Sequence, residues 1–139
     1  MLNIKYIKDT NFEYNQDIVN NLQNYNKNQS GYGDKDYRDF YVFEDDQLVG
    51  ACHIKLYADW CDIHGLYYDN IDVLKTIVND IKKYYKGKVV GISFETVLNQ
   101  RVEDFEEIGF SNEGKLEDMP KGNDKVFLKD MDFTAIDVD

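Results

Sequence analysis

Two polar side chains, Asp62 and His64, stand two positions apart in a segment rich in apolar and aromatic residues. In an extended strand, residues two apart point to the same face, so counting by twos back from Tyr68 places Leu66, His64 and Asp62 together on one face. A carboxylate can act as a general base, and a histidine, with an ordinary pKa of about 6.5, is suited to deprotonating an ammonium group. Asp62 and His64 are therefore chemically suited to accept a proton. The alternative, that both are half-exposed polar residues on a strand, remains open.

Aromatic side chains form a second candidate site. Tyr32, Tyr37 and Trp60 could line a pocket for a cationic substrate, because the faces of aromatic rings attract cations. Packing in the core and at its rim is the alternative for such residues. We predict no metal site and no disulfide framework, because Cys52 and Cys61 are the only cysteines and the sequence has no Cys-x-x-Cys or Cys/His cluster.

The composition narrows the class of protein. The 139 residues include 27 acidic and 16 basic side chains, which gives a net charge of −11. We expect one domain over 1–139. Binding to nucleic acid or to an anionic membrane depends on clustered lysine and arginine, so this negative charge argues against both. It favours a small cationic partner. The first residues lack the apolar core of a signal peptide, and no apolar run reaches the roughly 20 residues of a membrane helix, so we expect a cytoplasmic protein.

The positions of apolar residues predict the elements that hold these side chains. Alternating residues and an intervening turn predict a hairpin of strands 37–44 and 47–57, followed by a strand over 60–68. An apolar stripe from Leu74 to Tyr85, with Gly87 as a C-cap, predicts a long helix. The other predicted elements are a strand over 2–8, a helix over 15–26, a loop over 26–36, a strand over 88–94, a helix over 100–108 and two closing strands, the later over 125–133. The class is therefore α/β with a mixed sheet, in which the βαβ unit over 60–94 requires a parallel pair.

Three segments between about residues 40 and 132 resemble the GNAT superfamily of acyl-CoA-dependent N-acyltransferases. Residues 41–50 resemble the family's first hairpin, with Leu-Val-Gly after the turn. Residues 91–94 and 105–110 are similar to its buried strand and to the short helix that ends in a Gly-Phe motif, and residues 113–129 resemble its closing hairpin. The resemblance implies a mixed, mostly antiparallel twisted sheet whose parallel central pair is splayed around a cofactor cleft, flanked by about three helices.

The same resemblance implies transfer of acetyl from acetyl-CoA to a small primary amine, directly, after a base has deprotonated the amine. The implied catalytic base is Asp62 or His64, since Asp62 falls near the position where some relatives have a glutamate base. The acyl-pantetheine arm would follow the end of the strand at 66–68, and backbone amides of residues 71–74 would meet the pyrophosphate. Asn99 would touch the pantetheine or would only cap its helix. The implied cofactor-binding residues are Leu66, Tyr67, Tyr68, Ile71, Asp72, Val73, Leu74, Asn99 and Phe105.

The chain departs from the family pattern at two places. The loop before the long helix lacks the Arg/Gln-x-x-Gly-x-Gly/Ala signature and instead holds Asp69 and Asp72, whose charges would repel a pyrophosphate. Phe105 falls where the family often has a tyrosine that protonates the leaving thiolate, and a phenyl ring has no proton to give. These departures favour a second interpretation, a catalytically degenerate GNAT-fold module that binds a ligand or a protein partner. A homodimer is left open.

Overall fold

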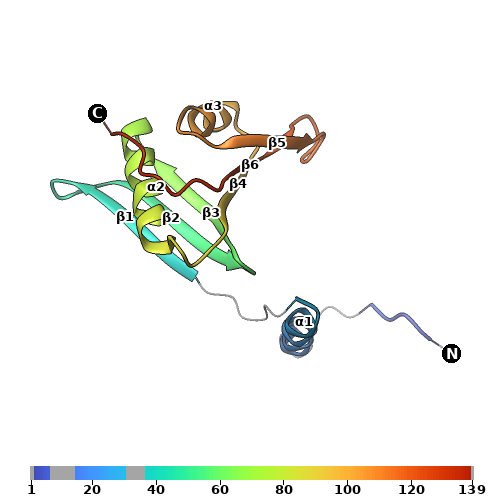
Figure 1. Ribbon diagram of the computed structural model, residues 1–139. Helices are drawn as coiled ribbons and strands as arrows, with labels where there is room; N and C mark the ends of the chain where they lie inside the picture. Colours follow the sequence, from blue (N-terminus) through green and yellow to red (C-terminus); the bar gives the residue numbers. More distant parts are fainter. Residues whose placement is uncertain (1, 7–14, 31–36, 139) are drawn as a thin grey trace. The chain divides into compact units, whose positions relative to one another are not determined.

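The computed structural model describes residues 2–6, 15–30 and 37–138, and the chain divides into two compact units, Met1–Asp34 and Lys35–Asp139. The first unit contains helix α1 (Asn15–Ser30), coloured blue in Figure 1. Asp17 lies in its first turn and Lys27 in its last, where the helix dipole favours these charges. The single domain expected over 1–139 stays a prediction.

The prediction for this first unit is corrected at both ends. The helix expected over 15–26 continues to Ser30, so the loop expected to begin at residue 26 does not begin there. Residues 2–6 form no strand, contrary to the strand predicted over 2–8, and residues 7 and 8 lie outside the described residues. Tyr32, one of the three aromatic candidates, also lies outside them.

The second unit is built on a six-stranded sheet with the order β1-β2-β3-β4-β6-β5. All neighbouring strands are antiparallel except β3 and β4, which are parallel. The strands are β1 (Tyr37–Glu44), β2 (Gln47–Tyr57), β3 (Trp60–Tyr68), β4 (Gly91–Thr96), β5 (Ser111–Leu116) and β6 (Lys125–Asp130).

Helix α2 (Ile71–Tyr85) covers one face of β1, β2 and β3 (Figure 1). The side chain of Asn70 caps the helix by accepting a hydrogen bond from the Val73 amide at 3.1 Å. The helix approaches the sheet at Gly50, where an added Cβ atom would lie only 2.5 Å from Val73 Cγ1. Glycine therefore permits the close packing here, and the side of β2 that carries Gly50 is the side that faces the core.

The C-terminal tail after β6 runs back across α2 (Figure 1). Asn79 on α2 holds it with two hydrogen bonds, donating to the Ile136 carbonyl at 2.8 Å and accepting from the Ile136 amide at 2.7 Å. Lys82, nearly one turn further along α2, forms a buried ion pair with Asp130 at the end of β6, with Nζ 3.0 Å from Oδ2. These contacts join α2, which packs on the first three strands, to the far half of the sheet.

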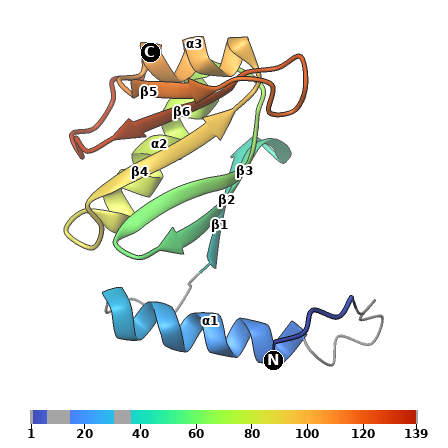
Figure 2. The same cartoon turned by 90° about the vertical axis from the view of Figure 1, so that its right-hand side faces the viewer.

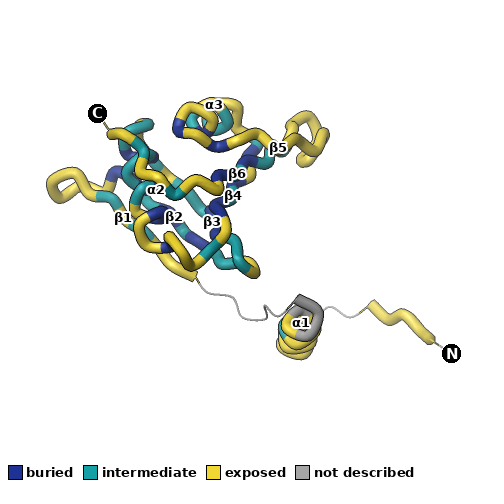
Figure 3. Tube along the Cα trace, in the orientation of Figure 1, coloured by how far each residue is buried: buried dark blue, intermediate teal, exposed yellow. Residues whose placement is uncertain are grey.

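Helix α3 (Asn99–Glu107) packs on that far half, against β4, β5 and β6. Its fully buried Phe105 stacks on Phe94 with 4.2 Å between ring centroids and meets Phe110 edge-on at 4.9 Å. Figure 3 shows buried segments on both halves of the sheet. The predicted α/β class is confirmed: the sheet is mixed and mostly antiparallel with one parallel central pair, and the described residues form three helices. None of these helices is long and apolar enough to cross a membrane.

Two strands are shorter than predicted, because backbone groups near their ends are used in turns. The amides of Lys88 and Val89 donate to the Tyr85 carbonyl, so the strand predicted over 88–94 begins only at Gly91. The strand predicted over 125–133 ends at Asp130, whose carboxylate accepts a hydrogen bond from the Asp132 amide at 2.9 Å and turns the chain.

Candidate active site

The two parallel central strands separate part-way along their length. Their pairing runs from Trp60 opposite Gly91 to Ile63 opposite Phe94. Past this point β3 continues beside β2 as far as Tyr68, and β4 continues beside β6. The divergence can be followed in Figure 2. Between the separated ends, backbone groups of both strands face a gap in the ladder and are free of strand pairing with each other. Such unpaired edges can bind a ligand, so the point of separation is the candidate active site.

A β-bulge lies at this point of separation. On β3, Ile63 pairs with Ile54 of β2, and Gly65 pairs with the next residue, His53, so His64 is an extra residue on its strand. A bulge reverses the alternation of faces along the strand that carries it. The sequence does hold a signal for it, since an isolated glycine within a strand, here Gly65, is typical of a bulge.

Because of the bulge, the prediction that Asp62, His64, Leu66 and Tyr68 share one face is wrong. Leu66 pairs with Cys52, a core-facing residue of β2, and both Leu66 and Tyr68 pack against the core. Asp62 pairs with Lys55 and points to the opposite, open face of the sheet.

Asp62 has the environment of a general base. Its Oδ1 accepts a hydrogen bond from Ser93 Oγ on β4 at 2.9 Å, and its Oδ2 lies 3.8 Å from Nδ1 of His64. Burial raises the pKa of the Asp62 carboxyl, and the hydrogen bond from Ser93 only partly opposes this. His64 is more exposed, at 62% of its side-chain surface against 30% for Asp62. The predicted pair is therefore close in space, with the aspartate as the sheltered member.

A second histidine extends this polar cluster across the open face. The rings of His64 and His53 lie 6.2 Å apart, edge to face, and His53 Nδ1 contacts an Asp39 carboxylate oxygen on β1. Tyr37 stacks on His53 at 5.5 Å between ring centroids. The candidate Tyr37 is thus next to His53, while the candidate Trp60 lies beside the start of β4.

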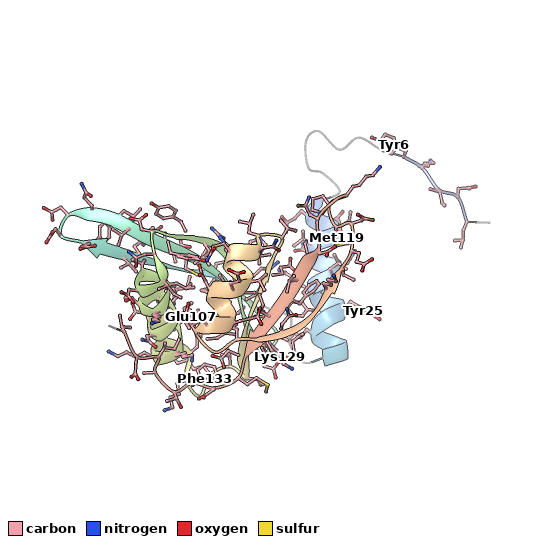
Figure 4. The ribbon with its side chains drawn as sticks, turned by 90° about the horizontal axis from the view of Figure 1, so that it is seen from above. Tyr6, Tyr25, Glu107, Met119, Lys129 and Phe133 are labelled. Atoms are coloured by element: carbon pink, nitrogen blue, oxygen red, sulfur yellow. The ribbon has the colours of Figure 1, made fainter. Side chains whose placement is uncertain are left out.

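Two hollows adjoin the separation of the strands. The first, of about 500 Å³, lies on the open face of the sheet. Asp62 and Trp60 line it together with residues for which the sequence predicted no role. Its lining includes Lys55, Tyr57, Trp60, Asp62, Ser93, Glu95, Glu113, Phe127 and Lys129, the last of which is labelled in Figure 4.

The second hollow, of about 590 Å³, lies where the first turns of α2 and α3 meet. Of the predicted cofactor-binding residues it is lined by Tyr68, Ile71 and Asn99. The structure adds Arg101, whose guanidinium donates a hydrogen bond to the Leu66 carbonyl at 2.9 Å. Asn99 is the first residue of α3, not its cap, since Leu98 holds the cap position.

The donors around this second hollow suit an anion. The Asn70 cap uses the amides of Val73 and Leu74, which leaves those of Ile71 and Asp72 as the first-turn amides outside the cap bonds. Arg101 adds a permanent positive charge.

Acidic side chains act against these donors, since Asp69 and Asp104 also line the hollow. The hydroxyl of Tyr67 donates a hydrogen bond to the Asp69 carboxylate, and the hydroxyl of Tyr68 donates one to the Asp104 carboxylate. The hollow thus offers the Arg101 guanidinium and the amides of Ile71 and Asp72 to an anion, against the two carboxylates of Asp69 and Asp104.

The remaining predicted cofactor-binding residues lie elsewhere. The side chains of Val73 and Leu74 are buried against the sheet, and Phe105 is in the core between Phe94 and Phe110. Tyr67 is half-exposed on the open face, in a smaller hollow beside His53. Among the described residues, no cluster of three or more His, Cys, Asp or Glu side chains is suited to hold a metal ion.

Comparison with known proteins gives a match in structure alone. No protein-family model and no curated protein sequence matches the chain. A protein from Agrobacterium tumefaciens, provisionally named an acetyltransferase, matches with a TM-score of 0.74 and 19% identity over 92% of this chain and 98% of its own. An acetyltransferase from Bacillus cereus matches with a TM-score of 0.71 and 20% identity, over 90% of this chain and 96% of its own. The aminoglycoside 6'-N-acetyltransferase from Enterococcus faecium matches with a TM-score of 0.59 and 14% identity, over 85% of this chain and 92% of its own. The chain thus has the fold of the GNAT acetyltransferases, which confirms the fold that the resemblance implied.

Proposed function

We propose that this protein is an N-acetyltransferase that transfers acetyl from acetyl-CoA to a small primary amine, with Asp62 as the general base. The observation that carries the proposal is a half-buried carboxylate of raised pKa one position before the central strands separate. A base is most effective when its pKa lies near the working pH, and burial moves the pKa of Asp62 in that direction. The acetyltransferase fold supports the class of reaction.

Acetyl-CoA, when bound, supplies an acetyl group activated as a thioester. Arg101 and the first-turn amides of α2 would hold its phosphates in the hollow between the two helices. Asp62 would accept the proton of the substrate ammonium, and Ser93 and His64 would keep its carboxylate oriented. The amine nitrogen would then form a bond to the acetyl carbon as the carbon–sulfur bond breaks, and the proton that the nitrogen loses would pass through water to the departing thiolate.

The chain offers no strong acid for the departing thiolate at the tyrosine position, because Phe105 is in the core. Tyr68 is the nearest hydroxyl on β3 to that hollow, but burial and its hydrogen bond to Asp104 raise its pKa well above the usual range. A hydroxyl with so high a pKa is a poor proton donor. We therefore expect water to protonate the thiolate.

A second candidate function is a binding module without catalysis. Two carboxylates near the start of α2 favour it, Asp69 just before the helix and Asp72 in its first turn, because their negative charges would repel an incoming phosphate. An enzyme releases CoA thiol in the presence of its amine, and such a module does not.

The release of CoA thiol distinguishes them. Purified protein, acetyl-CoA and a panel of amines are mixed with a chromogenic disulfide reagent, and the acetylated product is identified by mass. The protein's own thiols contribute little, because burial raises the pKa of Cys52 and of Cys61 to about 12. Amine-dependent thiol release supports the enzyme. Binding of acetyl-CoA without release for any amine supports the module.

A further inference from the structure

The first hollow has a regular composition that follows from the pairing of four strands. One row across the sheet holds Tyr57, Trp60 and Gly91, and the neighbouring row on the same face holds Lys55, Asp62, Ser93 and Lys129. A third row adds Glu95 and Phe127. The rings of Tyr57 and Trp60 thus lie on one side of Asp62 and that of Phe127 on the other, all facing the same open space.

Trp60 forms the floor of one end of this hollow. Its indole lies over Gly91, because a Cβ atom added there would be 2.5 Å from Trp60 Cζ3 and 2.7 Å from Cη2. Glycine at this position therefore leaves the space that the indole occupies. Tyr57, opposite Trp60 in the ladder and largely exposed, borders the same end.

Three carboxylates line the hollow, and two of them form ion pairs with lysines, Glu95 with Lys125 and Glu113 with Lys129, each at 3.6 Å. Asp62 accepts a hydrogen bond from Ser93, lies 3.8 Å from His64 and is opposite Lys55 in the ladder, whose charge also acts on it. Among the described residues, Asp62 is thus the lining carboxylate that forms no ion pair with a lysine. A molecule with many positive charges would also meet Lys55 and Lys129, so a single positive charge fits this lining best.

We infer that the first hollow receives the acceptor as a monoamine with a flat aromatic body, whose ammonium lies at Asp62 and whose ring lies on Trp60. The inference rests on the proposed acetyltransferase function and specifies its substrate class. Successive residues on one face of a strand are about 7 Å apart, which corresponds to a linker of roughly two to four carbons between nitrogen and ring. Polyamines and aminoglycosides lack the aromatic ring that this hollow would bury.

Trp60 is the only tryptophan of the chain, so its fluorescence reports on the hollow directly. The protein, with and without saturating CoA, is titrated with phenethylamine, 2-phenylethanol, spermidine and kanamycin, and calorimetry on the same samples gives each affinity independently of the optical signal. We expect phenethylamine to bind saturably, at least about ten-fold more tightly than the other three. Tighter binding of spermidine or kanamycin, or no saturable binding of phenethylamine, would overturn the inference.

Two variants locate the binding. Asp62→Asn should weaken phenethylamine by about ten- to a hundred-fold, because a hydrogen bond to a charged group is lost, and should leave 2-phenylethanol unchanged. Asp46→Asn, in the exposed turn between β1 and β2, removes the same charge away from the hollow and should change neither. Equal weakening in both variants would mean that only overall charge matters and would contradict the assigned site.

These titrations separate this inference from the proposed function. Binding of phenethylamine at Trp60, with no thiol release from acetyl-CoA for any amine of the panel, would refute the enzyme and leave the pocket assignment intact. Thiol release with spermidine but not with phenethylamine would support the enzyme and refute the aromatic substrate class.

Discussion

In the Asp62→Asn variant, the amide oxygen can still accept the hydrogen bond from Ser93 Oγ, which is 2.9 Å long in the wild type, but the charge is gone. A general base contributes about 100- to 10,000-fold to the rate, so we expect kcat to fall by this factor. The wild-type kcat/KM should rise with pH through the ionisation of Asp62, with an apparent pKa above the ordinary aspartate value of 3.8.

The same substitution should not destabilise the fold. Burial raises the folded-state pKa of Asp62, so the native state holds this proton more tightly than the unfolded chain does. The wild type therefore loses stability as the pH rises from about 3.8 through the folded-state pKa, and the variant does not. Each unit of such a shift corresponds to about 1.4 kcal/mol. The weaker hydrogen bond from Ser93 costs about 1 kcal/mol in return.

We therefore expect the variant at neutral pH to be at least as stable as the wild type, with an unchanged or higher Tm. Thermal unfolding at pH 4 and at pH 7.5 measures it, beside thiol release at each pH. Asp46→Asn, the exposed control, should leave both activity and the pH dependence of Tm unchanged. A kcat within about three-fold of the wild type would refute Asp62 as the base. A loss of more than about 2 kcal/mol at pH 7.5 would refute the argument from burial.

Three further substitutions test other parts of the structure. Arg101→Gln should weaken acetyl-CoA binding by about ten-fold in calorimetry, because the hollow loses the positive charge of its guanidinium. Lys82→Met should lower the free energy of unfolding by about 3–5 kcal/mol, since it leaves the Asp130 carboxylate buried and unpaired; chemical denaturation of this variant and of the double variant that also carries Asp130→Leu should show recovery in the latter. Asn79→Ala should cost about 1–3 kcal/mol by the same measurement, because both hydrogen bonds to the tail are lost, and hydrogen exchange should rise there first.

The sequence predicts the elements of the first half of the sheet well. The strands at 37–44, 47–57 and 60–68 have the predicted bounds, because alternation, a two-residue turn and β-branched or aromatic residues all agree there. The stripe through Ile77 and Ile81 likewise predicts α2. Where apolar residues continue past the end of an element, as at Val89 and Phe133, the sequence predicts strands that are too long, because backbone turns and not hydrophobicity set those ends.

The site is predicted less completely. Counting by twos places Asp62 beside Leu66, and the bulge at His64 moves them to opposite faces; only Gly65 hints at this in the sequence. Arg101 and Ser93 were missed because each reaches the site through tertiary structure, Arg101 from the first turn of α3 and Ser93 from a neighbouring strand. Such contacts between distant segments leave no local pattern in a single sequence.

Calorimetric titration of acetyl-CoA into the protein at moderate salt tests the central proposal most directly. We expect saturable binding with one site per chain, weakened by salt because Arg101 and backbone amides would hold phosphates at the hollow between α2 and α3. We also expect CoA alone to compete for the same site. No heat of binding up to millimolar acetyl-CoA would contradict the proposed function, because a transferase cannot act on a donor that it does not bind.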